Sequence, residues 1–348
     1  MTDRALVFFA SITDSPSVLT NLQRCMNAVG VNVRPLDAIL TTPLFSSSRS
    51  LQLLRDMQSE GTTILFDSGG YYVQTGRISY QELYMPLLDI YRAQDWATVF
   101  TLPDHVPTTR DRLEEVRRKV DDTVLYGRLF FEELPEALRE RAMPVVQGHT
   151  LKQVEQCLEA YIELGVRQIG FGSFGTSGKA SEVNVATQQA VELARHVIRV
   201  AHSHGMRVHL FGIGRPALVG MLKGVGADSF DSAAWLRAAG FGTVFLPFMR
   251  GYNITYRNTS GKIDVGITFD EYRRLAELTR HRCPYCDSLE LLQEKKLYRA
   301  AHNLIVMAEC VAAVNGHDYD HIEHIYRHGS KKYREEYKKW LGPDSWYT

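Results

Sequence analysis

The sequence predicts an α/β protein whose main unit is a closed (β/α)8 barrel. Short apolar runs alternate with segments of helical periodicity, and this alternation indicates parallel βαβ units. Eight such runs occur before residue 240, and each is followed by polar residues or glycines. Eight strands with polar carboxyl ends favour a barrel over an open Rossmann sheet.

Composition is that of a globular protein. The chain has 348 residues, of which 45% are hydrophobic and 23% are charged, so it can bury a full core. Forty basic and 40 acidic residues give a formal net charge of zero. Contact with a nucleic acid therefore requires a local basic face.

Targeting signals are not expected. The apolar run near the N-terminus is too short for a signal peptide or a membrane span, and no later segment is expected to be long enough to cross a bilayer. We expect a cytoplasmic protein without membrane contact.

The eight strands are expected in apolar runs that end in polar residues or glycines. They are 5–12, 33–40, 63–66, 97–102, 143–146, 168–171, 208–211 and a run ending at 231. The second is the weakest, because it contains Pro35.

Helices are expected between these strands, where apolar residues recur with helical spacing. They are 16–29, 48–60, 80–93, 109–141 (two helices broken near Pro135), 151–164, 185–204, 217–223 and 233–239.

The rhythm changes after residue 240. Residues 241–265 are aromatic and β-prone and predict a hairpin with a turn at Ser260-Gly261, and the chain is helical from Phe269 onward. The basic stretch 331–339 contains interleaved Tyr and is followed directly by Trp340. We expect residues 1–240 to form the catalytic barrel, and 241–348 to form a hairpin insertion and a zinc-binding helical subdomain packed on it.

Three predicted strands end in an acidic residue: Asp67, Asp104 and Asp231. Barrel enzymes keep their chemistry at the carboxyl ends of their strands, so three such acids suggest one shared pocket. We interpret Asp231 as a nucleophile and Asp67 as its acid/base partner. The alternative is that Asp231 caps the helix over 233–239 and that Asp104 only forms a turn. No helix is expected to begin directly after Asp67, where Ser68-Gly69-Gly70 allows close backbone approach.

A metal site is predicted by His281-Arg282-Cys283-Pro284-Tyr285-Cys286. Two thiolates in a Cys-x2-Cys pattern can occupy adjacent vertices of a zinc tetrahedron, and His281 and His302 could complete a closed, structural site. Two unpaired cysteines and two surface histidines are the alternative reading. Four later histidines compete for the fourth position, but their helical spacing favours a solvated or nucleic-acid-facing stripe: His317, His321, His324 and His328.

Several of these segments resemble, in order, the signature segments of tRNA-guanine transglycosylases. They are Asp67-Ser68-Gly69-Gly70-Tyr71, Val145-Val146-Gln147-Gly148, Gly212-Ile213-Gly214 and Phe230-Asp231. The Cys-x2-Cys followed by His302-Asn303-Leu304 resembles the zinc subdomain of that family. The resemblance covers roughly residues 60 to 305.

The resemblance implies a barrel enzyme that exchanges guanine for a 7-deazaguanine by double displacement. Asp231 would attack C1′ and form a covalent glycosyl-enzyme, and Asp67 would be the general acid/base. A retaining displacement needs one ionised and one protonatable carboxyl group, which agrees with these roles. The target base must leave its stack to be read.

The remaining roles implied by the resemblance concern binding of the base. Asp104 and Gln147 would hydrogen-bond its edge, the backbone at Gly172 and Ser173 would read its 7-substituent, and Tyr71 and Phe211 would sandwich its ring. The same match places further substrate-binding residues in the signature segments: Ser68, Gly69, Gly70, Gly148, Gly212 and Gly214.

The sequence departs from the tRNA enzymes in two respects. Their zinc motif begins Cys-x-Cys-x2-Cys, whereas His281 stands first here. The interval from Asp67 to Asp104 and the N-terminal region are also shorter and unlike those enzymes. The His-x-Cys-x2-Cys form resembles the DNA-guanine transglycosylases, which insert 7-cyano-7-deazaguanine (preQ0) into DNA. We therefore expect DNA as the substrate and Zn2+ as a structural ion; partner proteins of a modification system and a homodimer are compatible with this expectation. The alternatives are a tRNA transglycosylase, a non-catalytic accessory subunit that binds nucleic acid, and a barrel hydrolase of small glycosides.

Overall fold

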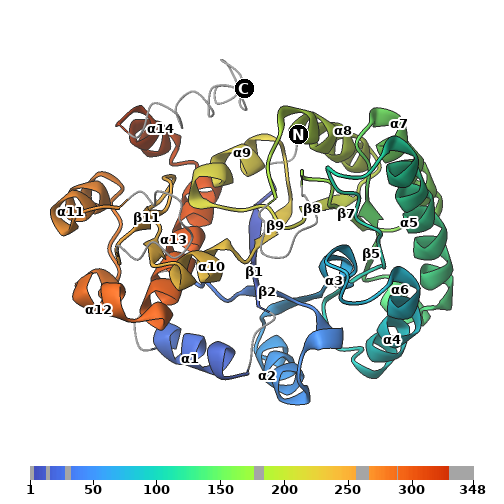
Figure 1. The fold of residues 1–348 in the computed structure, drawn as a ribbon, viewed down its shortest axis with the longest axis horizontal. Helices are drawn as coiled ribbons and strands as arrows, with labels where there is room; N and C mark the ends of the chain where they lie inside the picture. Colours follow the sequence, from blue (N-terminus) through green and yellow to red (C-terminus); the bar gives the residue numbers. More distant parts are fainter. Residues whose placement is uncertain are drawn as a thin grey trace.

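The computed structural model describes residues 4–12, 16–27, 33–175, 184–255, 266–287 and 289–328. Its centre is a parallel barrel with helices around it (Figure 1), as the sequence predicts. The strands are β1 (Val7–Ser11), β2 (Ala38–Thr41), β3 (Thr63–Phe66), β4 (Val99–Thr101), β5 (Ala142–Met143), β6 (Val145–Val146), β7 (Gln168–Phe171), β8 (Arg207–Leu210) and β9 (Ser229–Ser232).

The barrel closes at a proline. The strand order is β5-β4-β3-β2-β1-β9-β8-β7-β6, so the two ends of the sheet are β5 and β6, which are separated only by Pro144. Proline has no backbone N–H and interrupts the ladder there, but its carbonyl oxygen accepts a hydrogen bond from Gly170 N at 2.8 Å. The strand expected over 143–146 is thus one barrel position in two pieces, and the count of eight positions holds.

Most expected helices are present near their expected bounds. They are α1 (Pro16–Asn27), α2 (Ser48–Ser59), α4 (Tyr80–Ala93), α5 (Leu113–Glu133), α6 (Glu136–Arg139), α7 (Leu151–Glu163), α8 (Gln188–Ser203), α9 (Val219–Gly224) and α10 (Ala234–Gly240). Helix α5 ends and α6 begins on either side of Pro135, which confirms the predicted break.

Two expectations for local structure were wrong. A short helix, α3 (Gly70–Gln74), begins almost at once after Asp67, because Gly69 adopts φ 94° and turns the chain into it. Strand β2 occupies only the end of the expected 33–40 segment, since Pro35 cannot donate to a ladder.

The C-terminal region is a short antiparallel pair followed by helices. Strands β10 (Thr243–Val244) and β11 (Tyr252–Asn253) pair antiparallel, and the predicted turn at Ser260-Gly261 lies outside the described residues, as does the basic stretch 331–339. The helices are α11 (Phe269–Leu278), α12 (Leu289–Glu294), α13 (Lys296–Asn315) and α14 (Tyr319–His328).

Helix α13 joins the C-terminal region to the barrel. It packs on α10, α1, α9 and β1, and its last residue, Asn315, exchanges two hydrogen bonds with the backbone of Leu6 at 2.8 and 2.9 Å. By length and composition α13 could cross a membrane, so the expectation of no such segment was wrong. However, 61% of the relevant window is buried inside the protein, which is the packing of a core helix. The division at residue 240 stays a prediction.

Candidate active site and metal centre

Asp231 lies at the carboxyl end of β9, next to β1 in the barrel, and is only 6% exposed. One carboxylate oxygen accepts a hydrogen bond from Ser11 Oγ, and the other accepts one from Gly212 N, both at 2.5 Å. His209 Nε2 is 3.4 Å from the second oxygen. Helix α10 has no side-chain cap, so the interpretation of Asp231 as a helix cap was wrong: its oxygens are held by neighbouring strand ends.

Asp67 follows β3 on the other side of β1 and β2. Its Oδ2 atom accepts hydrogen bonds from Thr42 Oγ1 at 3.1 Å and from Gly69 N at 3.2 Å. Burial and, after it, the negative charges of Asp104 and Asp231 raise the pKa of Asp67 to about 7, against the opposing effect of the two hydrogen bonds. A carboxyl group with this pKa can both give and accept a proton near neutral pH.

Asp104 is the start of a buried chain of polar side chains. Its carboxylate accepts hydrogen bonds from Ser68 Oγ at 2.9 Å and from Gln147 Nε2 at 2.7 Å. Ser173 Oγ donates to Gln147 Oε1 at 2.6 Å and accepts from Gly148 N at 2.7 Å. Burial raises the pKa of Asp104 to about 6, while the Gln147 and Ser68 donors oppose that shift. Five residues that the sequence assigned to base recognition thus form one connected network.

Two glycines are required by this arrangement. Gly212 has φ 62°, which aims its N–H at Asp231 and which side-chain-bearing residues rarely adopt. A Cβ atom at Gly172 would lie 2.4 Å from Gln147 Nε2, so a larger residue would displace that amide. Gly214 also carries a close contact, since a Cβ there would meet the Phe230 ring at 2.7 Å.

The predicted aromatic pair has other neighbours. Tyr71 is 41% exposed and meets Tyr72 edge-on at 5.8 Å between ring centroids. Phe211 meets His209 edge-on at 4.5 Å. Stacking of a base between Tyr71 and Phe211 therefore stays a prediction.

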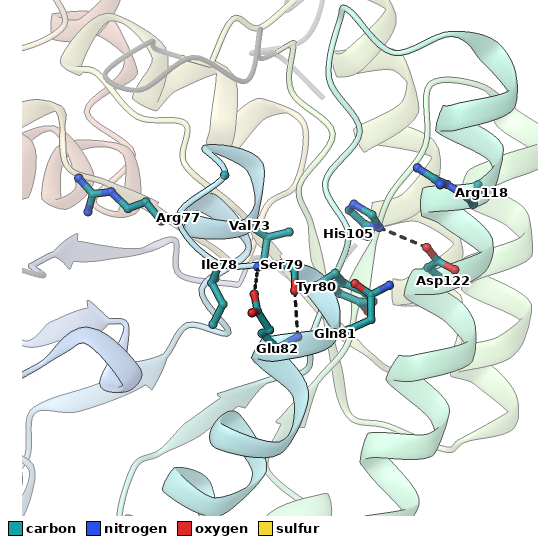
Figure 2. A pocket seen from close by; sticks show the side chains of 11 residues that line it. Val73, Arg77, Ile78, Ser79, Tyr80, Gln81, Glu82, His105, Arg118 and Asp122 are labelled. Atoms are coloured by element: carbon teal, nitrogen blue, oxygen red, sulfur yellow. Dashed lines mark hydrogen bonds and ion pairs between the residues drawn. The ribbon is translucent and has the colours of Figure 1, made fainter.

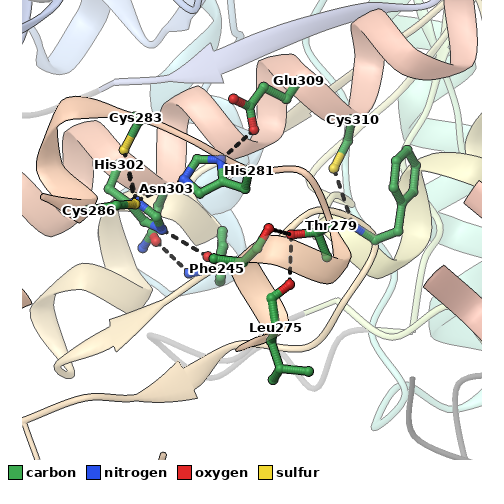
Figure 3. Close-up of polar contacts among 12 residues, drawn as sticks. Phe245, Leu275, Thr279, His281, Cys283, Cys286, His302, Asn303, Glu309 and Cys310 are labelled. Atoms are coloured by element: carbon green, nitrogen blue, oxygen red, sulfur yellow. Dashed lines mark hydrogen bonds and ion pairs between the residues drawn. The ribbon is translucent and has the colours of Figure 1, made fainter. Parts of the chain in front are cut away.

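The predicted metal ligands do come together, as Figure 3 shows. One ligand atom from each of His281, Cys283, Cys286 and His302 lies within 4.8 Å of all the others. His302 Nδ1 is 3.3 Å from Cys283 Sγ and 3.5 Å from Cys286 Sγ, and the two sulfur atoms are 3.4 Å apart. Two thiolates and two imidazoles around one point fit a tetrahedral metal ion with no open position. The alternative reading was wrong about the histidines, because His281 and His302 are buried and not on the surface.

The atoms around the cluster orient both imidazoles. Glu309 Oε2 is 2.6 Å from His281 Nδ1, and the carbonyl oxygen of Phe245 is 2.8 Å from His302 Nε2. Each partner accepts an N–H and leaves the other ring nitrogen free to face the metal position. The hydroxyl of Tyr272 is 3.2 Å from Cys286 Sγ. A closed donor set with such support is typical of a structural site.

The later histidines lie outside this cluster. His317, His324 and His328 are exposed and His321 is half-buried on or beside α14. This agrees with the solvated stripe and not with a competing ligand.

Sequence reasoning missed the residues that hold the acids. Ser11, Thr42 and His209 contact Asp231 or Asp67 from the ends of strands β1, β2 and β8. Ser11 and Thr42 lie at the carboxyl ends of their strands, as the acids do. This shared position could have identified them as candidates from the sequence. Glu309 lies 28 residues after His281 and carried no local pattern.

The fold and the site together define a class: a barrel enzyme with paired carboxyl groups at the strand ends and a metal-binding C-terminal region. Comparison with known families makes the assignment. The chain matches the model of the queuine tRNA-ribosyltransferase family over residues 93–317, and it belongs to that family. A search of curated proteins found no match.

Membership of this family makes the protein a guanine transglycosylase, a pentosyltransferase that acts on nucleic acid and a guanine-like base. Enzymes of this family bind structural zinc, and the His2Cys2 cluster fits such an ion. The matched range contains Asp104, Asp231 and the metal cluster, whereas Asp67 lies before its first residue.

Proposed function

We propose that this protein exchanges guanine in DNA for preQ0 through a covalent intermediate on Asp231. The observation that carries the mechanism is the placement of Asp231 and Asp67 at the carboxyl ends of β9 and β3, on either side of β1 and β2, where the charge of Asp231 contributes to the raised pKa of Asp67. One group is held by donors on both of its oxygens, and the other is poised to exchange a proton. A double displacement at a sugar carbon needs this division of roles.

In the first step, a carboxylate oxygen of Asp231 bonds to C1′ as the C1′–N9 bond breaks. The electron pair of that bond leaves with guanine, which takes a proton from Asp67. In the second step, the incoming base gives a proton to the Asp67 carboxylate, and its N9 atom attacks C1′ and releases Asp231. Protons and bonds balance over the two steps, so no other reactant is needed.

Recognition of the base is assigned to the polar network of Asp104. Its carboxylate, the Gln147 amide and the Ser173 hydroxyl are held by one another in a buried site. A rigid set of donors and acceptors loses little entropy on binding and rejects a base that leaves one unpaired. The backbone at Gly172 and Ser173 is proposed to read the 7-substituent.

The preference for DNA rests on His281. It stands where the tRNA enzymes have cysteine, and this form resembles the DNA-directed branch. The ion in the cluster is proposed to be Zn2+. The alternative substrate is tRNA, which a protein distinguishes from DNA through the 2′-hydroxyl. An accessory subunit without activity is disfavoured, because both carboxyl groups are present.

Incorporation of radiolabelled preQ0 into DNA and into tRNA, with this protein alone, tests the proposal. Label in DNA and not in tRNA is expected. Label in tRNA only would overturn the choice of substrate but leave the mechanism standing. A denaturing gel that shows no covalent enzyme–DNA adduct under trapping conditions would contradict the proposed intermediate.

A further inference from the structure

A second cleft lies beside the candidate active site, between the α3–α4 connection and α5 (Figure 2). Its volume is about 550 Å³, and its lining includes Val73, Ile78, Tyr80, His105 and Arg118. Pockets of this size hold small organic ligands such as a nucleotide. None of the roles assigned above uses this cleft, which we call the His105 cleft.

The His105 cleft and the base-recognition network are connected by short segments of the chain. His105 directly follows Asp104 in the chain. Helix α3 separates the two sites: a Cβ on Gly70 at its start would lie 3.0 Å from Asp104 Oδ1, whereas Val73 near its end lines the cleft. Gly70 and Val73 are three residues apart, a rise of about 4.5 Å along the helix, which is close to one nucleotide step of a stacked strand at about 3.4 Å.

His105 is fixed in one orientation on the cleft wall. Its ring stacks on Tyr80 with centroids 4.8 Å apart and an interplanar angle of 14°. Its Nδ1 atom is 3.3 Å from Asp122 Oδ2, and its backbone N–H donates to Thr123 Oγ1 at 2.9 Å. His105 lines the cleft with 17% of its side chain exposed.

The charged side chains that line the cleft differ in how strongly they interact with other groups of the protein. The Glu82 carboxylate accepts the backbone N–H of Ser79 at 2.9 Å, and Asp122 is paired with His105. Arg118 has an ion pair with Glu115 at 3.9 Å, in which its side chain is 66% exposed. Such an exposed pair contributes little and exchanges readily for a stronger anion. Arg77, at the other rim, places its guanidinium over the Tyr72 ring at 5.3 Å. Arg118 is therefore the group available to an incoming phosphate.

We propose that the His105 cleft binds a nucleotide that flanks the exchanged guanine, with its unstacked base on the His105 ring and its phosphate on Arg118. The proposal rests on the proposed function in one respect, namely that a nucleic-acid strand binds at the carboxyl ends of the barrel strands, which we call the barrel mouth. An aromatic ring with a nearby arginine is the usual combination for holding a single strand without reading its sequence. Binding of a neighbour also keeps the target guanine out of its stack.

Binding of a fluorescein-labelled single-stranded DNA, followed by anisotropy with the full chain, tests the proposal. Arg118→Ala should weaken binding about tenfold and lower the slope of log K against log salt by about 0.7, as expected for one lost phosphate contact on a single strand. Arg117→Ala is the matched control, because Arg117 lies on the same helix and is 81% exposed but does not line the cleft. Equal effects of the two substitutions would overturn the phosphate contact.

The stacking contact is tested at His105. Loss of one stacked base predicts that His105→Ala weakens binding about 5- to 150-fold, whereas His105→Phe keeps the ring and stays near the parent value. Equal losses in both variants with unchanged melting curves would contradict stacking. The KM for the free base should not change in any of these variants.

Failure of this inference is distinguishable from failure of the proposed function, because strand binding is measured without base exchange. Exchange of guanine with unaltered binding in Arg118→Ala and His105→Ala would refute the cleft alone. Weakened binding in both variants, in a protein that exchanges no base, would support the cleft and refute the function.

Discussion

The barrel mouth and the metal centre are both clusters of buried polar side chains. They differ in how the free-energy cost of burying charged groups is offset. At the metal centre four ligand atoms face one point, and both histidines have partners that fix their second nitrogen. A divalent ion there would neutralise the thiolates and leave no open position. At the barrel mouth three carboxyl groups share one region: burial raises the pKa of both Asp67 and Asp104, and the charges of Asp104 and Asp231 raise that of Asp67 further. The metal centre therefore has the properties of a structural site. At the barrel mouth no counter-ion is needed, and the carboxyl groups remain available for reaction.

This difference predicts that the two regions fail differently. A change at the barrel mouth should remove activity and leave the fold intact, whereas a change at the metal centre should destabilise the fold.

Asp231→Asn should lower the rate of base exchange at least about 10³-fold, because an amide cannot bond to C1′ and no other group replaces it. The substitution keeps the size of the side chain, so the metal content and the melting temperature should stay near those of the parent protein. The measurement is incorporation of labelled base, with metal analysis on the same sample. Residual activity above a tenth of the parent rate would rule out Asp231 as the nucleophile.

Removal of the metal should unfold the C-terminal region, since metal binding there contributes folding free energy. Chelation should lower the melting temperature and remove protection of α13 in hydrogen exchange. His281→Ala should have a similar effect, whereas His281→Cys restores a ligand and should keep the metal. An unchanged melting curve after complete removal of the metal would show that the centre is not structural.

Asp67 predicts a dependence of stability on pH. Its folded-state pKa is about 7 and its ordinary value is 3.8, so the native protein holds a proton between these pH values that the unfolded chain has lost. Stability should therefore fall as the pH rises through this window. Asp67→Asn should be more stable than the parent at pH 8 by roughly 2–4 kcal/mol, with no difference below about pH 4.

The raised pKa of Asp67 also predicts how the activity depends on pH. In the proposed mechanism guanine takes a proton from Asp67, so kcat/KM should fall as the pH rises above about 7. Denaturant unfolding and pH-rate profiles are the two measurements. A stability difference that does not vary with pH would show that Asp67 titrates normally.

Ser11→Ala should have the smallest effect. It removes one donor from Asp231 and leaves those from Gly212 and His209, so the exchange rate should fall about tenfold, the cost of one hydrogen bond to a charged group. Ser17→Ala, on α1, is the control on the same segment of the chain. A loss as large as that of Asp231→Asn would show that Ser11 does more than position the carboxylate.

Local patterns determined much of this protein. The alternation of apolar runs and helical segments was sufficient for a barrel of eight positions, because each element buries one face with its own periodicity. The break at Pro135 and the His-x-Cys-x2-Cys cluster were also predictable, since ring geometry and ligand spacing act over a few residues.

The contacts that side chains make with the three acids cannot be read from the sequence. The distances between the acids, and so their electrostatic interaction, also depend on the tertiary structure. Ser11 and Asp231 are 220 residues apart in sequence, and His281 and Glu309 are 28 apart. Barrel closure through Pro144 and packing of α13 on β1 bring such residues together. A pKa depends on burial and on charges in space, neither of which a linear pattern contains. The sequence therefore specified the chemical groups, and the closed barrel placed Asp104 and Asp231 close enough to Asp67 to raise its pKa.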